Sequence, residues 1–428
     1  MLVIWELAVF MNSSYHHQRV ISKITLEFGQ LAMAKLEESD KPVKNVLAFG
    51  GNGFIGSEVL NQLFQDPNQY YKVALVSRGN WYFDSETRIK PHLAKRIICD
   101  REDSDIEYCK DLVNYVATTE KIDIVLDFSA YDPEVLSSTL DLVQEKAALY
   151  VYISTDSVYE VCKPSKIPGL ANEHDAVRPE NEQQQSVLNN GDEYGNQKLL
   201  GEEILRSPEN KVPFLIFRLP DVLGPRDTTD RFWAYQMWIT FYKFIQVPVH
   251  VPKEYRHLKT SYVYVKDIGK AVFAGINKPE AWNDVYNLAI DRSLTLEEFL
   301  TDMAKELNET VEFDFEGEFN LFPSVTRGAV NIDKVKRVLR FVPTKWETVL
   351  KETVEFYKEG FYQFSERDDA AHQLTRYVIP KHKKGPFLQL LDQLVSDKNL
   401  KLSDIMKEPE KEVTAEQLFE EMQYKTEL

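Results

Sequence analysis

The chain has 428 residues, of which 28% are charged, and carries a formal net charge of −17 with a pI near 5.1. This length allows a large core and predicts two or three domains. The acidic surface disfavours broad binding to nucleic acid or to an anionic membrane, and no apolar run approaches the length of a membrane span. We therefore expect neither nucleic acid nor a membrane among its partners.

The three cysteines, Cys99, Cys109 and Cys162, are an odd number. Their spacing fits neither a disulfide framework nor a zinc site. No two histidines have helical metal-binding spacing with an acid nearby, so we expect no metal. Unpaired cysteines are typical of a reducing compartment, and we predict a cytoplasmic protein.

Residues 1–42 are interpreted as a leader. The opening MLVIWELAVFM is apolar but short, lacks basic residues and contains Glu6, which makes it a poor signal peptide. Residues 11–23 carry Arg19 and Lys23 without an acid, so an organelle-targeting segment stays open as an alternative. A second alternative is that Met33 is the true start and that residues 1–32 are dispensable.

From Val43 onward, short apolar runs alternate with helical patterns. Continuous Val, Ile and Leu runs are typical of strands buried on both faces, and their alternation with helices predicts parallel βαβ units in a doubly wound sheet. The fold class is thus α/β, with a Rossmann-type domain over 43–218. The expected strands are Asn45–Phe49, Lys72–Ser77, Arg96–Cys99, Asp123–Asp127, Leu149–Ser154 and Val212–Arg218, and the expected helices are Ile55–Phe64, Ile106–Ala117, Pro133–Lys146 and Tyr194–Leu205.

Three further regions differ from this alternation. Residues 163–193 are polar and rich in Pro, Asn and Gln, which predicts a long surface loop. Residues 219–365 mix both patterns and predict a smaller substrate domain interleaved with the first, while 366–428 form a charged helical extension, partly disordered. Expected elements are helices at Phe232–Phe244, Lys266–Ile276, Leu294–Leu307, Phe387–Val395 and Ala415–Tyr424 and a strand at Val285–Ala289. The aromatic residues of Phe232–Phe244 are interpreted as core, with a substrate-lining or dimer role as the alternative.

A glycine-rich loop follows the first strand, with the sequence Gly50-Gly51-Asn52-Gly53-Phe54-Ile55-Gly56. In dinucleotide-binding loops such glycines permit a tight turn, close approach to a pyrophosphate and close helix–strand packing. The helix that follows would present free N–H groups to the phosphates. Since strand, loop and helix occur in the required order, we predict a dinucleotide site here rather than a plain glycine turn.

The end of the second strand indicates which dinucleotide binds. An acid there would contact the ribose of NAD, but this strand ends in Ser77-Arg78. A hydroxyl and a guanidinium suit the 2′-phosphate of NADP, so NADP is favoured and NAD is the alternative. Asp100, after the third strand, is assigned to the adenine, although it could equally cap the next helix.

Tyr194 and Lys198 lie four residues apart on a predicted helix, which places both side chains on one face. A neighbouring ammonium would lower the phenol pKa and make the tyrosine a usable acid or base. Thr155 ends strand five, beside the expected nucleotide crevice, and its hydroxyl would bind the same substrate oxygen. The alternatives are a surface helix and a Ser/Thr-rich turn that satisfies only its own backbone.

Together these motifs resemble the extended short-chain dehydrogenase/reductase family, also called the NAD-dependent epimerase/dehydratase family. GGNGFIG, STDSVY, YGNQK, FRLPDVLGPRD and YVYVKDIGKAV match its landmarks in order over about residues 44–360. The resemblance implies that Tyr194 is the acid/base, that Lys198 tunes it and holds the nicotinamide ribose, and that Thr155 binds the reacting oxygen. Ser129 is also assigned to the cofactor site. Hydride would pass between a substrate carbon and the nicotinamide.

The chain departs from the family pattern at positions that concern the substrate. Family dehydratases carry two acids after the threonine, whereas here Asp156 is followed by Ser157, so a 4,6-dehydratase is not expected. Asp221 stands where nucleotide-sugar members usually have Asn, and Thr260 where they usually have Arg. Both changes remove groups that favour a diphosphate. Arg226, Arg231 and Arg256 are the candidates to compensate, with a solvated surface charge as the alternative for each. Asp156, Asp221 and Arg226 are the predicted substrate residues.

We therefore expect an NAD(P)-dependent oxidoreductase or epimerase that acts on a hydroxyl or carbonyl carbon of a small, sugar-like substrate. One alternative is a nucleotide-sugar 4-epimerase. The other is a non-catalytic dinucleotide-binding protein, or an RNA-associated relative of the chloroplast stem-loop-binding members of this superfamily. The intact Thr155, Tyr194 and Lys198 set favours an enzyme, and a homodimer is allowed.

Overall fold

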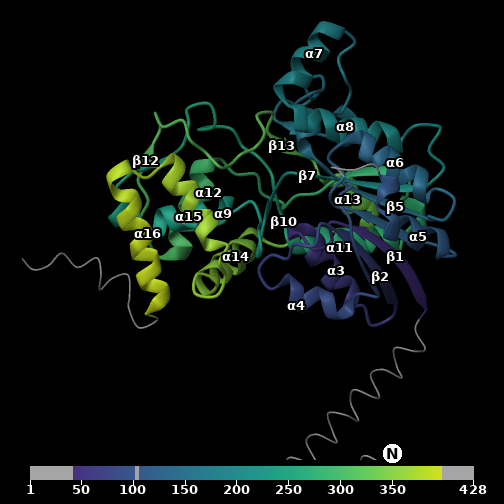
Figure 1. Ribbon diagram of the computed structural model, residues 1–428. Helices are drawn as coiled ribbons and strands as arrows, with labels where there is room; N and C mark the ends of the chain where they lie inside the picture. Colours follow the sequence, from purple (N-terminus) through teal and green to yellow (C-terminus); the bar gives the residue numbers. More distant parts are fainter. Residues whose placement is uncertain (1–41, 102–105, 398–428) are drawn as a thin grey trace, which may run out of the picture.

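The computed structural model describes residues 42–101 and 106–397 (Figure 1). The predicted leader, apart from its last residue, and the helix expected at Ala415–Tyr424 lie outside the described residues. None of the helices within the described ranges is both long and apolar enough to cross a membrane.

Seven parallel strands form the central sheet, in the order β11-β7-β5-β4-β1-β2-β3. The chain winds outward from β1 to β3, then returns to the other side of β1 and continues from β4 toward β11. The predicted doubly wound sheet is confirmed, and its order reverses between β1 and β4, which is where such sheets bind ligands. The strands are β1 (Val43–Phe49), β2 (Tyr70–Ser77), β3 (Lys95–Ile98), β4 (Ile124–Asp127), β5 (Tyr150–Thr155), β7 (Phe214–Leu219) and β11 (Asp284–Asn287).

Helices cover both faces of this sheet because β1, β4, β5 and β7 bury apolar side chains on both sides. On one face lie α3 (Phe54–Phe64), α11 (Val265–Ile276) and α13 (Asp333–Leu339), and on the other α5 (Lys110–Thr118), α6 (Pro133–Val143) and the end of α8 (Glu193–Leu205). Local signals set their ends: Asp132 caps α6 by accepting from Glu134 N at 2.7 Å, and Pro133 stands at its first position.

A second lobe lies beside the sheet (Figure 1) and has its own aromatic core around Trp233, Trp238, Phe299 and Tyr357. The aromatic helix is therefore part of a core, as expected. The described part of the C-terminal extension shares this core through Leu374 and other buried residues. The lobe comprises α9 (Arg231–Thr240), α10 (Tyr242–Ile245), α12 (Leu296–Leu307), α14 (Trp346–Gly360), α15 (Arg367–Tyr377) and α16 (Lys381–Ser396), with the strand pairs β8 (Asp221–Leu223) with β10 (Tyr262–Tyr264) and β9 (Val249–His250) with β12 (Phe313–Asp314).

Two expectations about this region need correction. The strand expected at Val285–Ala289 is β11, and it forms the edge of the central sheet beside β7. The segment 163–193 is not one long loop, since it contains β6 (Leu170–Ala171) and α7 (Glu182–Gly191). Asn181 caps α7 by accepting from Gln184 N at 2.9 Å, and the Glu and Gln residues that follow favour a helix. The sequence analysis missed this helix because it assigned the whole segment to a loop from its polar composition.

Short elements complete the described fold: α4 (Ser85–Ile89), the 3₁₀ turns Lys90–His92, Ile106–Tyr108, Asp156–Tyr159, Glu173–Asp175 and Pro279–Ala281, and β13 (Ala329–Val330), which pairs with β6.

Candidate active site

The glycine loop joins β1 to α3 with the geometry that a pyrophosphate site needs. Gly50 has a φ of +71° and donates to Val76 O at 3.0 Å, so the chain turns sharply at the carboxyl end of β1. A Cβ on Gly56 would lie 2.5 Å from Gly50 O and 2.6 Å from the Cα of Gly51. Because a side chain is excluded at this point, α3 approaches the loop closely, as in dinucleotide-binding folds. The first N–H groups of a helix have no partner within the helix and suit a phosphate.

A cavity of about 280 Å³ adjoins this loop. All predicted cofactor residues of the loop except Gly51 line it, together with Ser77, Arg78, Asp100 and Ser129. Arg78 is exposed at the end of β2, whereas Ser77 is buried and accepts from Gly79 N at 3.3 Å. Glycines without room for side chains, a helix N-terminus and polar groups at three strand ends fit a dinucleotide.

Sequence reasoning missed a buried ion pair below this cavity. Arg101 donates to Asp127 at 2.9 Å and forms a second, shorter bond to the same carboxylate, which also accepts from Tyr150. Burial alone would raise the pKa of Asp127, but the Arg101 guanidinium holds it below its usual value. Arg101 also donates to Ser129 Oγ at 3.1 Å. The pair thus fixes the wall of the cavity, and the only signal in the sequence was an acid at a strand end.

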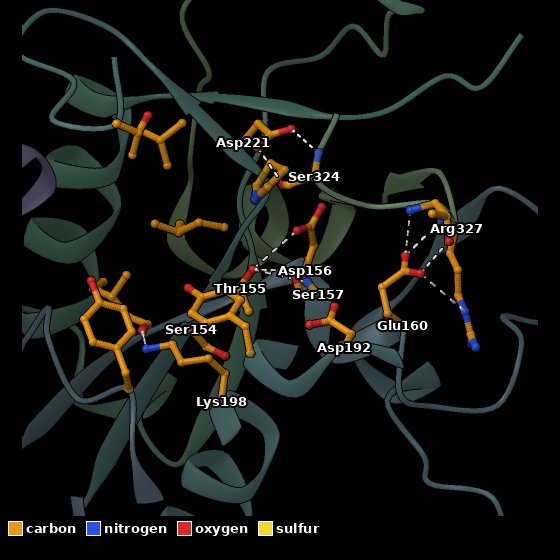
Figure 2. A pocket seen from close by; sticks show the side chains of 18 of the residues that line it. Ser154, Thr155, Asp156, Ser157, Glu160, Asp192, Lys198, Asp221, Ser324 and Arg327 are labelled. Carbon is orange, nitrogen blue, oxygen red and sulfur yellow. Dashed lines mark hydrogen bonds and ion pairs between the residues drawn. The ribbon is translucent and has the colours of Figure 1, made fainter. Parts of the chain in front are cut away.

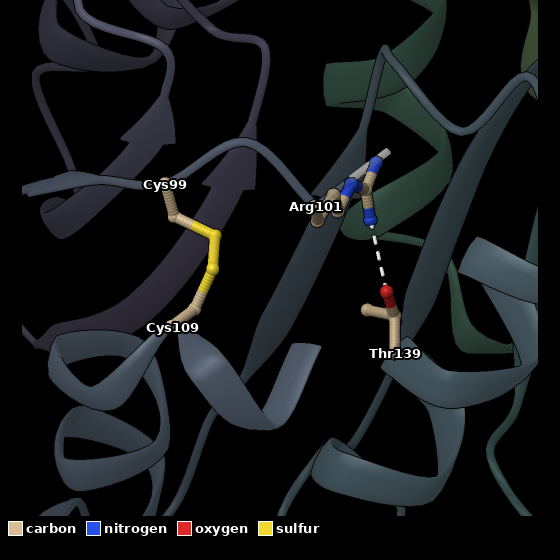
Figure 3. The surroundings of a disulfide bond; sticks show 4 residues. All are labelled: Cys99, Arg101, Cys109 and Thr139. Carbon is tan, nitrogen blue, oxygen red and sulfur yellow. Dashed lines mark hydrogen bonds between the residues drawn. A yellow bond between two sulfur atoms is a disulfide. The ribbon is translucent and has the colours of Figure 1, made fainter. Parts of the chain in front are cut away.

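Cys99 and Cys109 form a disulfide beside Arg101 (Figure 3), with their Cα atoms 5.7 Å apart. The expectation that no cysteines pair was wrong. Cys99 follows β3 and Cys109 immediately precedes α5, so the fold brings together two residues whose spacing gave no sign of it. Cys162 is buried and free. The cysteines therefore no longer favour a reducing compartment.

Thr155, Tyr194 and Lys198 line one larger cavity of about 920 Å³ (Figure 2). Thr155 is the last residue of β5, while the other two lie one turn apart near the start of α8. Lys198 is 2% exposed, and its Nζ donates to the carbonyl oxygens of Ala130 at 3.0 Å and Ile153 at 2.7 Å. The structure brings the three predicted residues together. The two cavities share Phe54, Ile55, Phe128, Tyr131 and Thr229, so they adjoin.

The pKa of Tyr194 differs from the expectation. Burial raises the pKa of this phenol above its usual value, and the nearby Tyr131 and Asp156 add to the rise, while the Thr155 hydroxyl opposes it. About 46% of Tyr194 is exposed to the open cavity, but the protein walls on its sides limit hydration of the phenolate. The sequence predicted that Lys198 lowers the pKa of Tyr194. In the protein without bound cofactor, the pKa of Tyr194 is raised instead.

The predicted substrate residues are distributed unequally. Asp156 and Asp221 line the larger cavity. Both oxygens of Asp221 are bound: Oδ1 accepts from Arg231 and from Ser324 Oγ, each at 2.6 Å, and Oδ2 accepts from Ser324 N at 3.0 Å. Arg226 lines neither cavity, because its φ of +72° turns it toward Asp84, with which it forms a bidentate ion pair. Its assignment to the substrate was wrong.

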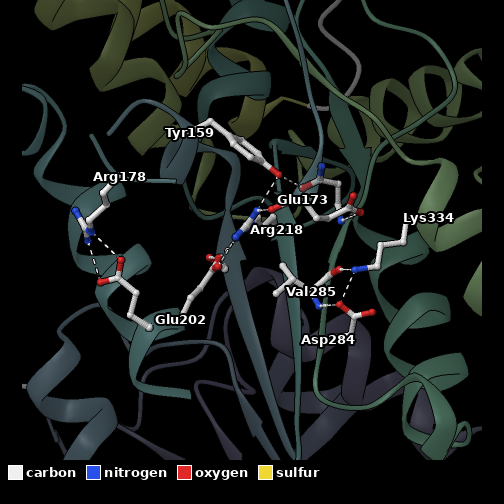
Figure 4. A network of polar contacts seen from close by, with 11 residues as sticks. Tyr159, Glu173, Arg178, Glu202, Arg218, Asp284, Val285 and Lys334 are labelled. Atoms are coloured by element: carbon white, nitrogen blue, oxygen red, sulfur yellow. Dashed lines mark hydrogen bonds and ion pairs between the residues drawn. The ribbon is translucent and has the colours of Figure 1, made fainter. Parts of the chain in front are cut away.

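A second buried ion pair anchors α8 to the sheet (Figure 4). Arg218 of β7 donates to Glu202 of α8 at 2.9 and 2.5 Å, and both side chains are fully buried. Glu202 also accepts from Ser154 Oγ at 2.6 Å, and Arg218 donates to Tyr159 Oη at 2.9 Å. This network holds the helix that carries Tyr194 against the end of β5. The sequence did not predict this pair, because Glu202 and Arg218 lie on a helix and a strand that meet only in the folded protein.

The doubly wound sheet, the glycine loop and the adjoining Tyr/Lys cavity define a dinucleotide-dependent enzyme of Rossmann type. The chain belongs to the NAD dependent epimerase/dehydratase family, whose model matches residues 46–289. The predicted resemblance is thereby confirmed, and with it the broad activity of an oxidoreductase or epimerase that depends on a nicotinamide dinucleotide.

Several known proteins are similar to the chain. The dTDP-D-glucose 4,6-dehydratase of Mus musculus is 24% identical over 384 residues, which cover 79% of this chain and 96% of the mouse protein. The human dTDP-D-glucose 4,6-dehydratase is 25% identical over 361 residues, covering 76% and 93%. Among solved structures, UDP-glucuronic acid 4-epimerase from Bacillus cereus in complex with NAD has a TM-score of 0.59 at 17% identity, covering 76% of this chain and 99% of that one. UDP-glucose 4-epimerase from Thermotoga maritima has a TM-score of 0.57 at 19% identity, covering 74% and 99%.

Proposed function

We propose that the protein transfers hydride between a nicotinamide and a hydroxyl or carbonyl carbon of a small, sugar-like substrate, with Tyr194 as acid/base. The observation that carries this proposal is that Thr155 and Tyr194 line one cavity that adjoins the cavity of the glycine loop. A substrate oxygen bound between two hydroxyls would place its carbon beside the dinucleotide. In this role Thr155 orients the oxygen, and Tyr194 gives or takes its proton.

The loop Gly50–Gly56 and the N-terminus of α3 would hold the pyrophosphate, with Ser129 and Asp100 nearby. When bound, the nicotinamide supplies the hydride acceptor or donor. Lys198 is held by two carbonyls below the cavity, from where it would bind the nicotinamide ribose. We propose NADP, because Arg78 is exposed beside the cavity with no acid at that strand end. The B. cereus structure contains NAD, and NAD is the alternative.

A nucleotide-sugar 4-epimerase is the second candidate, favoured by the similar epimerase and dehydratase sequences and structures. Against it, Asp221 lines the cavity, and Arg231, which lines the same cavity, is already bound to it. Dehydration is disfavoured because Ser157 follows Asp156 where a second acid would be required. Because two of the similar proteins are 4,6-dehydratases, the test of function also looks for a dehydrated product. The cytoplasmic location and the homodimer stay predictions.

The test uses full-length protein with NADPH and with NADH. The protein is incubated with a panel of sugars, amino sugars, sugar acids and their UDP and dTDP derivatives. Net oxidation or reduction is followed by nicotinamide absorbance, a change of configuration by NMR of the product, and a loss of water by mass spectrometry. A product that differs from substrate only in configuration or in oxidation state at one carbon supports the proposal. A product that has lost water would replace it with dehydration, and failure to bind either dinucleotide would contradict it.

A further inference from the structure

The larger cavity is unusually acidic for a site that would take a diphosphate. Five carboxyl side chains line it: Asp156, Glu160, Asp192, Asp221 and Asp227. Three basic side chains line the same cavity. A phosphate group entering here would meet repulsion unless the basic groups were free to bind it.

Those basic groups are already engaged with the protein. Arg231 donates to Asp221 at 2.6 Å, so it neutralises that acid. Arg327 lies 4.0 Å from Glu160 and also donates to the carbonyl oxygen of Cys162 at 2.5 Å. Lys198 donates to two backbone carbonyls. The cavity therefore holds more carboxyl groups than basic groups that could bind an incoming phosphate.

Asp156 is the least compensated of them. It is 4% exposed, and its Oδ1 accepts from Thr155 Oγ1 at a long 3.5 Å. Its Oδ2 has no hydrogen-bond partner among the described residues, and none of their Lys or Arg side chains lies at ion-pair distance from it. Burial raises the pKa of this carboxyl well above its usual value, and the charges of Asp221 and Glu160 add to the rise. A buried carboxyl in this state is destabilising unless a ligand supplies the missing donor.

Figure 2 shows Asp156 among the lining side chains, next to Thr155, with Glu160, Asp192 and Asp221 lining the same cavity. We propose that the substrate carries a protonated amine, which binds the carboxyl group of Asp156 beside the oxygen held by Thr155 and Tyr194. This inference rests on the proposed function, because it names the substrate class of the same cavity. An ammonium donates three hydrogen bonds, which matches a cavity rich in acceptors and poor in free donors.

The test compares probes that differ only in the amine. Binding of D-glucosamine, N-acetyl-D-glucosamine and D-glucose to full-length protein saturated with NADPH is measured by ligand-observed NMR at pH 6.5. Glucosamine should bind about tenfold more tightly than glucose or N-acetylglucosamine. Asp156→Asn should remove that preference, while Asp291→Asn, which removes an exposed acid elsewhere, should retain it.

Equal affinities for glucosamine and glucose, no measurable binding of glucosamine, or a preference that survives Asp156→Asn would each overturn the inference. If Asp156→Asn does not fold, the comparison of glucosamine with glucose on the unmutated protein still tests whether the cavity prefers an amine. Tyr194-dependent turnover is measured on the same sample. If any sugar of the screening panel is turned over but glucosamine binds no more tightly than glucose, the proposed function stands and the amine site fails. If the preference is present but no probe is turned over, the site stands and the reaction fails.

Discussion

Lys198 and Glu202, one turn apart on α8, bind consecutive residues of β5: Lys198 donates to the carbonyl oxygen of Ile153 at 2.7 Å, and Glu202 accepts from Ser154 Oγ at 2.6 Å. The next residue of the strand is Thr155. The helix that carries Tyr194 is thus fixed in register with the strand that carries Thr155, and the spacing of the two hydroxyls depends on this attachment.

The first prediction concerns that attachment. Glu202→Gln leaves the fully buried Arg218 without its carboxylate partner, so it should lower the free energy of unfolding by about 3–5 kcal/mol. Glu203→Gln is the matched control, because its ion pair with Arg178 is partly exposed and should contribute below about 1 kcal/mol. Urea unfolding measures both. Equal effects of the two substitutions would show that the buried pair does not hold α8.

The second prediction concerns the glycine loop. A Cβ at Gly56 would clash with backbone atoms of Gly50 and Gly51, which cannot move without opening the turn. Gly56→Ala should therefore weaken dinucleotide binding by at least about tenfold, or ~1.4 kcal/mol. Gly385→Ala is the control, since the added methyl group in α16 would meet no atom within 4 Å beyond its chain neighbours and the helix's own backbone. Calorimetric titration with NADPH compares them, and unchanged affinity in Gly56→Ala would place the cofactor elsewhere.

The third prediction concerns the choice of dinucleotide. NADPH should bind more tightly than NADH, and Arg78→Ala should narrow the difference by about tenfold or more, because it removes a charge-assisted hydrogen bond to the 2′-phosphate. Fluorescence titration of the bound nicotinamide gives both constants. Equal affinities for NADPH and NADH in the unmutated protein would contradict the proposed preference for NADP.

These sites differ in how far the sequence could predict them. The loop at Gly50–Gly56 and the Tyr194/Lys198 pair were predictable because both depend on local spacing along a strand–turn–helix unit and on one helix. The two buried ion pairs, Arg101 with Asp127 and Arg218 with Glu202, could not be predicted, because each pair joins elements that meet only in the folded protein. The same reason explains the missed disulfide. Arg226 was misassigned because its positive φ, which directs it to Asp84, has no signature in a non-glycine residue.

The fourth prediction follows from the raised pKa of Tyr194. A phenol whose pKa lies above its usual value is protonated through the neutral range, so it is ready to donate a proton in reduction but must lose one to act as base in oxidation. The rate of oxidation should therefore rise with pH without reaching a plateau below about pH 10, while the rate of reduction stays flat. A plateau of the oxidation rate near neutral pH would contradict this prediction and show that Lys198 and the bound cofactor lower the pKa of Tyr194.

The account depends most on Tyr194 as the acid/base, and Tyr194→Phe tests it most directly because it deletes only the hydroxyl. The variant should fold normally and bind NADPH with nearly unchanged affinity, since the ring still packs against Tyr131. Turnover on the substrate found in the screen should fall by about 10²–10⁴-fold, the loss expected for a positioned general acid/base. Turnover that stays close to that of the unmutated protein would contradict the mechanism.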